Sequence, residues 1–467
     1  MAHESEAAAE EDALEEARDE GYDLDRKAVA RILYAVDTDD REQLVALMEP
    51  LHPADIADLL EQVNAYDRMR LVRLYGHEMD GDILSELDEA LREEVIGILT
   101  PQVLAEAIRE LDSDDVVDLI EDLDAPQQEA ILDALPESER AAVEQSLAYP
   151  EFSAGRLMQR EVVMAPEHWS VGEAIDFLRS SKSLPEQFYH IVLVDPRLRP
   201  VGNVTLGRLM SSKRDVTLKS IQEESFHTIP VAQYEGEVAY AFNQYHLISA
   251  PVVDENDRLV GQITIDDAMA VLDEENEEDI LRLAGVDGES RLSDKVVDTV
   301  KRRIPWLAVN LVTAVMASLV IAQFEAAIAE VVALAVLMPI VASMGGNAGT
   351  QSLTVAVRAL ATKDLTGSNL WRVIRREGAV GLINGVAFAV IMGIVGIIWF
   401  GSPALGGVIA SAMVINLVIA GLAGIIIPVV LEKVGVDPAL ASGAFVTTVT
   451  DVVGFFAFLG LAVVVLL

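Results

Sequence analysis

The chain has 467 residues, contains no cysteine and carries a formal net charge of −42 at pH 7. This length is enough for about three domains. The lack of cysteine excludes a disulfide framework, thiol catalysis and cysteine-bound metal. So acidic a surface repels nucleic acid, which is therefore not an expected partner, and it attracts cations.

The charge is concentrated in the first 300 residues. From residue 301 onward there are seven of the 76 acidic and nine of the 34 basic residues, which leaves residues 1–300 with a net charge of −44. This division predicts an acidic soluble part followed by an apolar membrane part. Because lysine is scarce beside arginine, adaptation to high salt explains the bulk charge better than cation sensing does. Only particular carboxylates remain candidates for sensing.

Residues 1–24 are acidic and have no apolar core, so we expect a disordered tail and not a signal peptide. Residues 25–149 place apolar side chains at i, i+3, i+4 and i+7 almost throughout, which is typical of amphipathic helices. Pro, Ser or Asp begins several of these segments, as at many helix starts. The pattern predicts an all-α superhelical N-terminal domain.

An internal repeat follows at an offset of 59 residues, which pairs Asp195 with Asp254 and Gly202 with Gly261. Each unit, 150–211 and 212–272, reads as a helix, a short β-branched strand, a turn, a second strand and a helix. This arrangement is similar to a tandem cystathionine-β-synthase-type (CBS) pair, an α+β regulatory module. Such pairs often bind adenine nucleotides such as ATP; a plain dimerisation scaffold without nucleotide is the alternative.

Residues 273–300 read as an acidic linking helix followed by a turn marked by glycine, and residues 301–467 as a membrane domain. About 20 apolar residues suffice to span a bilayer as a helix. Basic residues mark only one side of the spans, which makes that side cytoplasmic. The soluble part is then cytoplasmic and the C-terminus lies outside the plasma membrane. Five spans are expected at about 304–324, 331–357, 379–400, 405–431 and 439–466.

The second span carries polar side chains between small ones. Pro339 and the pair Gly345–Gly346 are candidate kink points. Asn347, Gln351 and Thr354 share one helical stripe, with Thr350 nearby, which favours a pore wall over simple hydrogen bonding between helices. Single polar residues in other spans are interpreted as packing contacts: Asn310, Asn384 and Asn416.

The fifth span has a single charge, Asp451, near its middle. A carboxylate there costs roughly 2.5–3.5 kcal/mol, so it usually faces a cavity, an ion path or a partner. Gly443, Thr447, Asp451 and Gly454 lie on one face by helical spacing. We interpret the span as a pore-lining helix whose carboxylate meets a cation. The alternative is a structural Asp bonded to a neighbouring helix.

The order of parts resembles the MgtE family of magnesium channels over nearly the whole chain. The motifs that carry the resemblance are PIVASMGGNAGTQS and RALAT in the second span, GVDPALASGAFVTTVTDVVGFF in the fifth, and NEEDILRLAGV before the membrane. The resemblance implies a homodimer in the lipid bilayer with one Mg²⁺ pore on its two-fold axis, and no enzyme activity. Its pore residues would be Asp451, Asn347, Thr447, Gln351 and Gly346.

The resemblance also implies that cytoplasmic Mg²⁺ binds between acidic domains and closes the pore. At high Mg²⁺ the ions would bridge carboxylates; at low Mg²⁺ the carboxylates would repel one another. Ala270 and His246 stand where the family can carry acids, which implies fewer or weaker sites. The implied sensing residues are Asp82, Asp114, Asp118, Asp267, Glu275, Glu278 and Asp279.

Other functions stay open at this point. Oxygen ligands do not separate Mg²⁺ sharply from Co²⁺, Mn²⁺ or Ni²⁺, so a broader divalent cation transporter is one alternative. A CBS-regulated membrane sensor without transport is another, although it would leave the polar second span unexplained. A chloride channel is disfavoured by the acidic pore helix, and an intramembrane aspartyl protease by the single membrane Asp in the fifth span.

Overall fold

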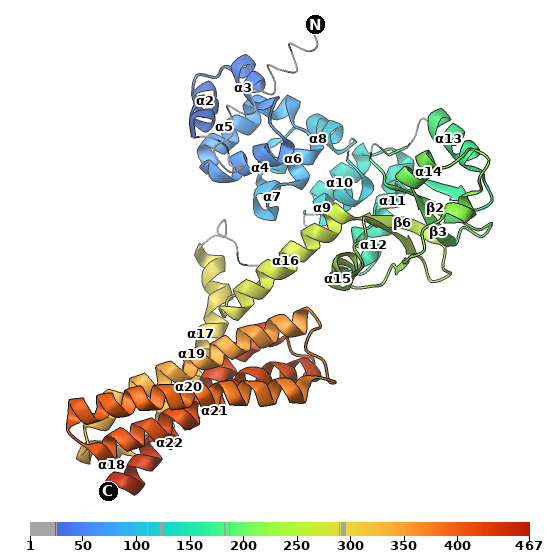
Figure 1. The fold of residues 1–467 in the computed structure, drawn as a ribbon. Coiled ribbons are helices and arrows are strands. Elements are labelled where there is room, and N and C mark those ends of the chain that lie inside the picture. The colour runs from blue at the N-terminus through green and yellow to red at the C-terminus, as the bar shows by residue number, and fades with distance from the viewer. Residues whose placement is uncertain are drawn as a thin grey trace. The chain divides into compact units, whose positions relative to one another are not determined.

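The computed structural model describes residues 24, 26–109, 111–121, 123, 125–181, 184–185, 187–288, 290 and 296–467 (Figure 1). The chain forms two compact units, Met1–Asp273 and Glu274–Leu467. Apart from Leu24, the expected acidic tail lies outside the described residues.

Short helices fill the first part of the N-terminal unit, as their periodicity predicted. They are α2 (Arg26–Asp37), α3 (Arg41–Met48), α4 (Pro53–Gln62), α5 (Ala65–Tyr75), α6 (Gly81–Ser85), α7 (Glu89–Ile98), α8 (Pro101–Ile108), α9 (Ser113–Glu121), α10 (Ala125–Ala134) and α11 (Glu137–Leu147). Local caps set their starts: the Asn64 side chain accepts hydrogen bonds from the backbone N–H groups of Tyr66 and Asp67 at 3.1 Å. One continuous apolar core, which includes Leu44, Leu71 and Leu119, joins the helices.

Two three-stranded sheets follow, and they confirm the internal repeat. Their strands are β1 (Met164–Pro166), β2 (His190–Val194) and β3 (Pro200–Thr205), then β4 (Ile229–Pro230), β5 (Ser249–Val253) and β6 (Leu259–Thr264). In each sheet the first pair of strands is parallel and the second pair antiparallel. The register is the same in both, because Leu193 faces Gly202 and Val252 faces Gly261.

Helices cover these sheets and complete a CBS pair: α12 (Ala154–Leu157), α13 (Val171–Ser180), α14 (Leu206–Ser211) and α15 (Glu235–Tyr245). Each sheet has its own apolar core. The repeated aspartates are turn residues: Asp195 accepts from the backbone N–H of Arg197 at 2.7 Å, and Asp254 from that of Asn256 at 2.8 Å. The repetition of these two aspartates therefore reflects turn chemistry.

The linking helix, α16 (Ile265–Leu283), begins within the second CBS unit and not at residue 273. No Pro or Gly interrupts the chain between these bounds, so the helix that covers β6 continues as the linking helix. The turn expected after it is present, with Gly285 in the left-handed region at φ +75°. The expected linking segment is thus one helix that ends soon after residue 283.

Among the described residues of the second unit, five helices are long and apolar enough to cross a membrane, as predicted. They are α17 (Val296–Ala322), α19 (Ala333–Ala361), α20 (Leu370–Phe400), α21 (Pro403–Val434) and α22 (Pro438–Leu466), with the short α18 (Glu325–Glu330) between the first two. The expected kink points do not interrupt the second span, since α19 continues through Pro339 and Gly345.

Glycines allow close packing around α21, the central helix. In the most apolar 18-residue segment of α21, 50% is buried inside the chain, whereas the corresponding share in α17 is 6%. A Cβ at Gly381 would lie 2.6 Å from the Leu417 carbonyl, and one at Gly385 would lie 3.0 Å from the Val414 Cα. The backbones of α20 and α21 therefore approach closely through small residues, as membrane helices often do.

Asn416 of α21 is fully buried between the two helices that carry the polar motifs. Its Nδ2 donates to the Val341 carbonyl of α19 at 2.8 Å. Its amide also fills the space beside Gly345 of α19 and Gly454 of α22. The packing interpretation holds for Asn416, whereas Asn310 and Asn384 are exposed on the single chain.

This packing predicts that Gly345→Ala destabilises the membrane unit, because its Cβ would overlap the Asn416 amide. Overpacking of this kind costs typically about 1–3 kcal/mol. We expect a lower melting temperature in detergent, partly restored in the double variant with Asn416→Ala. The control is Gly407→Ala, where an added Cβ meets nothing within 4 Å. Strictly additive effects of the two substitutions would contradict the contact.

Candidate functional site

The carboxylate of Asp451 lies near the middle of α22 and is half-buried. Pro438 occupies the first turn of this helix, and the Asp437 side chain caps it by accepting from the Ala439 N–H at 2.8 Å. Within the described ranges, no side chain or backbone group forms a hydrogen bond or ion pair with the Asp451 carboxylate. A structural bond to a neighbouring helix of the same chain is therefore not formed. The carboxylate is left to meet a cation or a second copy.

Thr447 lies one helical turn before Asp451 and is exposed on the single chain. Its Oγ1 donates to the Gly443 carbonyl at 2.6 Å, so the hydroxyl proton is satisfied by the helix itself. A Cβ at Gly346 of α19 would lie 3.8 Å from the Thr447 Cγ2. The structure thus brings Gly346 and Thr447, two residues of the predicted pore set, to one seam between α19 and α22.

The predicted polar stripe of α19 is exposed on the single chain at Asn347 and Gln351. The Asn347 amide makes only a long contact of 3.5 Å, to the Ser343 hydroxyl on its own helix. The opposite side of α19 is occupied by packing, since a Cβ at Gly349 would lie 2.6 Å from the Val446 Cγ1. The polar amides are therefore directed away from the helix contact and are available to an ion or a partner.

The predicted face of α22 needs one correction. Gly454 was placed on the small polar face with Thr447 and Asp451 because of its spacing. In the structure Gly454 is buried against Asn416 of α21, whereas Thr447 is exposed. Helical spacing cannot decide this, because the boundary between the packed and exposed faces depends on where the neighbouring helix lies. Gly454 belongs to the packing surface.

In the first unit, predicted sensing residues from α9 and α16 meet. Asp114 is 8% exposed, and burial raises its pKa well above its usual range, with a further contribution from the charge of Asp267. Burial likewise raises the pKa of Asp267 to about 6, although Thr264 donates its hydroxyl to that carboxylate at 2.7 Å. Burial opposes ionisation of both carboxyl groups, and the side chains of Asp114 and Asp267 also hydrogen-bond to each other. A divalent cation would stabilise their charged forms.

Asp115 belongs to this carboxylate cluster and was missed from the sequence. Burial raises its pKa to about 7, and the charges of Asp267, Asp118 and Asp82 contribute. Asp118 itself is exposed and pairs with Arg92 at 2.7 Å, and Asp82 is exposed. Asp114 and Asp118 were named from the family resemblance, and nothing in the local sequence indicated that the adjacent Asp115 is also desolvated.

A second carboxylate group lies in the other unit, at the end of α16. Glu275, Glu278 and Asp279 are half-buried on this helix. Burial raises the pKa of Asp279 to about 6, with contributions from the charges of Asp437 and Glu275. Arg282 offsets part of this charge, because it pairs with Glu278 at 2.7 Å and with Asp437 at 3.2 Å. Asp437, the cap of α22, was missed because its sequence context before Pro438 indicated only a helix start.

Neither carboxylate group forms a complete metal-binding site in the described part of the single chain. Among the described residues, no three His, Asp or Glu side chains are placed so that they would hold one metal ion. The donor set nevertheless fits Mg²⁺, which keeps several waters and is often bound through one or two carboxylates. Cys-bound metals are excluded, since the chain has no cysteine.

Comparisons with known proteins cover both units. The family profile MgtE, a divalent cation transporter, matches residues 338–461, the MgtE intracellular N domain matches 51–152, and the CBS domain matches 154–215 and 218–274. The magnesium transporter MgtE of Bacillus subtilis is 30% identical over 417 residues, which cover 89% of this chain and 92% of that protein. The protein of the same name from Thermus thermophilus is 31% identical over 445 residues, covering 94% and 98%.

A solved structure is also similar to the soluble part. The cytosolic domain of the Mg²⁺ channel MgtE in complex with ATP is 28% identical, and the match covers 52% of this chain and 99% of that chain with a TM-score of 0.48.

The raised pKa of Asp115 predicts how stability depends on pH. Between about pH 4 and 7 the folded state keeps a proton that the unfolded chain has lost, so stability falls as the pH rises through this window. Asp115→Asn removes the penalty and should stabilise the cytoplasmic unit by on the order of 2–4 kcal/mol at pH 8, with little effect near pH 4. Thermal melts without divalent ions at both pH values measure this.

The control for this prediction is Asp257→Asn, at an exposed turn position outside the cluster. Its melting temperature should follow that of the wild type at both pH values. Equal stabilities of Asp115→Asn and the wild type at pH 8 would show that the carboxylate is not destabilised by burial.

Proposed function

The chain belongs to the MgtE family of divalent cation transporters and is not an enzyme, and we propose that it conducts Mg²⁺ through a pore formed by α19 and α22 of two copies. The cargo is proposed from the magnesium transporters that it resembles. One observation carries the pore assignment. Asp451 is a half-buried carboxylate in mid-span without a partner in the described part of the chain.

A desolvated carboxylate in a membrane is stabilised most by a cation. Mg²⁺ loses its water reluctantly and prefers octahedral oxygen coordination. A pair of Asp451 carboxylates would therefore hold a hydrated ion through its waters. Such a site is strong enough to attract the ion and loose enough to release it, as conduction requires.

The homodimer supplies the second carboxylate. In a two-fold dimer the same surface of both copies meets, so a residue near the axis is contributed twice. The polar residues exposed on the single chain support this arrangement, because Asn347, Gln351 and Thr447 would otherwise face lipid. Together with Gly346 they form the proposed wall on either side of Asp451.

The pore assignment predicts that Asp451→Ala abolishes Mg²⁺ uptake. Without the two carboxylates nothing attracts the hydrated ion to mid-span, so uptake should fall by about tenfold or more. Proteoliposomes under an inside-negative potential and loaded with a Mg²⁺ indicator measure this. Asp364→Ala, at an exposed position between α19 and α20, removes the same charge outside the pore and serves as control.

Three results would change the assignment. Equal uptake by Asp451→Ala and the wild type would make Asp451 structural. Passage of Co²⁺, Mn²⁺ or Ni²⁺ at the rate of Mg²⁺ would assign a broader divalent cation transporter. No transport of any divalent ion by a folded wild-type protein would favour the CBS-regulated membrane sensor.

Gating follows from the two carboxylate groups. Asp114, Asp118 and Asp82 with Asp267 in the first unit, and Glu275, Glu278 and Asp279 in the second, would each bind Mg²⁺ when its cytoplasmic concentration is high. The raised pKa values of Asp267 and Asp279 support this, since repulsion and burial together favour a bound cation. Mg²⁺ then shifts the population toward the closed state only if that state binds it more tightly.

This gating mechanism predicts that the triple variant Glu275→Gln, Glu278→Gln, Asp279→Asn is less inhibited by internal Mg²⁺. The concentration for half-inhibition in patch recordings should rise by about tenfold, because the ion loses three carboxylates. The matched control is Asp273→Asn, Glu274→Gln, Glu277→Gln, which removes three charges from exposed positions of the same helix. If the concentration for half-inhibition rises equally in both variants, the effect comes from the loss of net charge and not from a Mg²⁺ site.

The CBS pair is the proposed place for an adenine nucleotide such as ATP. The His190 Nδ1 lies 2.8 Å from the Ser249 Oγ, so equivalent positions of the two sheets meet across the repeat. This polar contact between the sheets supports a ligand site there. The plasma membrane, with cytoplasmic N-terminal domains and the C-terminus outside, is the proposed location.

A further inference from the structure

Helix α20 has one packed side and one exposed side. Gly381 and Gly385 lie on the packed side, against the backbone of α21, and α20 packs almost entirely on that helix (Figure 1). On the opposite side, apolar side chains recur at intervals of three or four residues. These residues, the α20 stripe, are all exposed on the single chain: Ile383 69%, Val386 51%, Val390 58%, Ile394 53% and Ile397 43%.

Three arginines precede the α20 stripe on the same helix. Arg372, Arg375 and Arg376 are exposed and lie in the first two turns of α20. Arg376 lies one turn after Arg372 and two turns before Ile383, so both arginines are on the side of the stripe. The exposed side of α20 therefore has positive charge at one end and an apolar surface beyond it.

The chain does not offset these charges. Within the described residues, no hydrogen bond or ion pair involves the guanidinium group of Arg372, Arg375 or Arg376. The only acidic residue in the sequence of α20, Glu377, points elsewhere, because its carboxylate accepts a hydrogen bond from the Ser352 hydroxyl of α19 at 3.1 Å. An anion on the exposed side would therefore meet unpaired positive charge.

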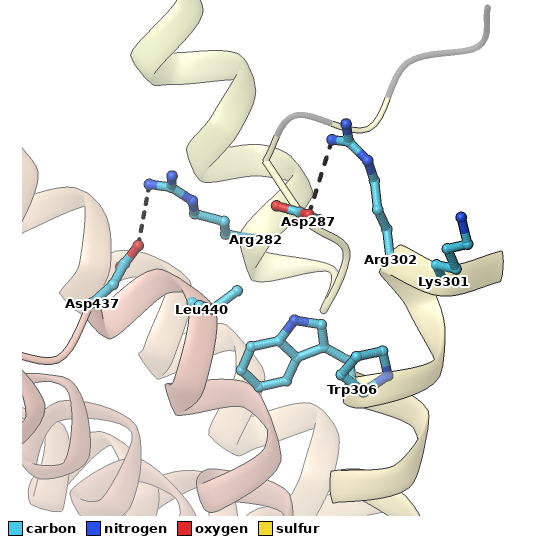
Figure 2. Close-up of a pocket in the computed structure, with 8 residues that line it drawn as sticks. Arg282, Asp287, Lys301, Arg302, Trp306, Asp437 and Leu440 are labelled. Carbon is cyan, nitrogen blue, oxygen red and sulfur yellow. Dashed lines mark ion pairs between the residues drawn. The ribbon is translucent and has the colours of Figure 1, made fainter. Parts of the chain in front are cut away.

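The basic residues near the start of α17 differ from those of α20. Figure 2 shows two ion pairs around a cavity there, Arg282 with Asp437 at 3.2 Å and Arg302 with Asp287 at 3.9 Å. Because these cations already have carboxylates beside them, they attract a further anion less than the arginines of α20 do.

Two exposed tryptophans indicate the depth of the arginines in the bilayer. Trp371 and Trp399 lie near the two ends of α20, which at about 1.5 Å per residue places them about 42 Å apart. A bilayer with its head-group regions is about 40–45 Å thick, and tryptophan favours both of its interfaces. Arg372 and Arg376, beside Trp371, then lie at the level of the lipid head groups, and the α20 stripe lies at the level of the acyl chains.

We propose that Arg372 and Arg376 bind the phosphate group of an anionic membrane lipid whose acyl chains cover the α20 stripe. Guanidinium groups hold phosphate oxygens through paired hydrogen bonds, and Arg375 adds a further charge. The stripe favours a lipid over free phosphate, because inorganic phosphate would leave the apolar side chains uncovered.

A second copy of the chain fits this surface less well. In a two-fold dimer whose copies are inserted in the same direction, the same surface of both copies meets. The arginines of one copy would then face those of the other without an anion between them. Charge complementarity therefore favours the lipid as the group that covers this side of α20.

The test compares arginines of two spans in the full-length protein. Arg376→Gln removes one guanidinium group of the site, and Arg376→Lys keeps the charge without the paired hydrogen bonds. Arg303→Gln removes an exposed charge at the start of α17 and serves as control. Each protein is incubated in detergent with phosphatidylglycerol or phosphatidylcholine, and native mass spectrometry measures the bound lipid. We expect about fivefold weaker phosphatidylglycerol binding for Arg376→Gln, a smaller loss for Arg376→Lys and no change for Arg303→Gln.

Other outcomes would overturn the proposal. Equal phosphatidylglycerol binding by Arg376→Gln and Arg303→Gln would overturn the site. Inorganic phosphate that binds through Arg376 in a calorimetric titration, with no preference for phosphatidylglycerol over phosphatidylcholine, would overturn the lipid as ligand. The spectra also count chains, so a change from dimer to monomer in Arg376→Gln, without loss of lipid, would assign this side to a second copy.

Two features keep the result interpretable. Should Arg376→Gln fail to fold in a thermal melt, Arg372→Gln against Arg303→Gln makes the same comparison. Lipid binding does not depend on transport, so the result stands whatever the cargo of the pore.

Discussion

Desolvation of one carboxylate in the middle of α22 is the constraint that the membrane unit has to meet. The cost of burying Asp451 in an apolar span is not offset by any bond within the described chain. In the proposed homodimer, a cation between the two copies would offset it. In the proposed pore, the exposed amides of α19 would face the same hydrated ion. In this proposal, α20 and α21 hold α19 and α22, the two helices that would face the ion, in place.

That support depends on small residues and one buried amide. Glycines let α20 and α21 approach to backbone contact, and Asn416 joins α21 to both α19 and α22. In lipid there is little hydrophobic drive between helices, so close packing and a few hydrogen bonds must hold them in register. An error of one residue in that register would move Asp451 relative to Asn347. Packing at Asn416 and the ion coordination proposed for Asp451 would therefore be linked, although the two residues have different roles.

In the first unit, too, the main electrostatic cost comes from carboxyl groups that are removed from water. Burial of Asp114, Asp115 and Asp267 raises the pKa of each carboxyl, so their ionised forms are disfavoured when no cation is bound. In the proposed gating mechanism, bound Mg²⁺ would offset this cost, which lowers the stability of the ion-free state. The remaining acidic surface of the chain does not need this explanation, since most of its carboxylates are exposed and solvated.

Local patterns in the chain were enough to predict the order of domains, the repeat at an offset of 59, the five spans and the charge at mid-span. These features depend on hydropathy, periodicity and turn chemistry, which neighbouring residues carry. Three-dimensional packing was needed to show that Asp115 is desolvated, that Asp437 lies beside Asp279, and that Gly454 contacts Asn416 and not the polar face. These features depend on residues distant in the chain, and burial and electrostatic repulsion arise only once folding brings those residues together.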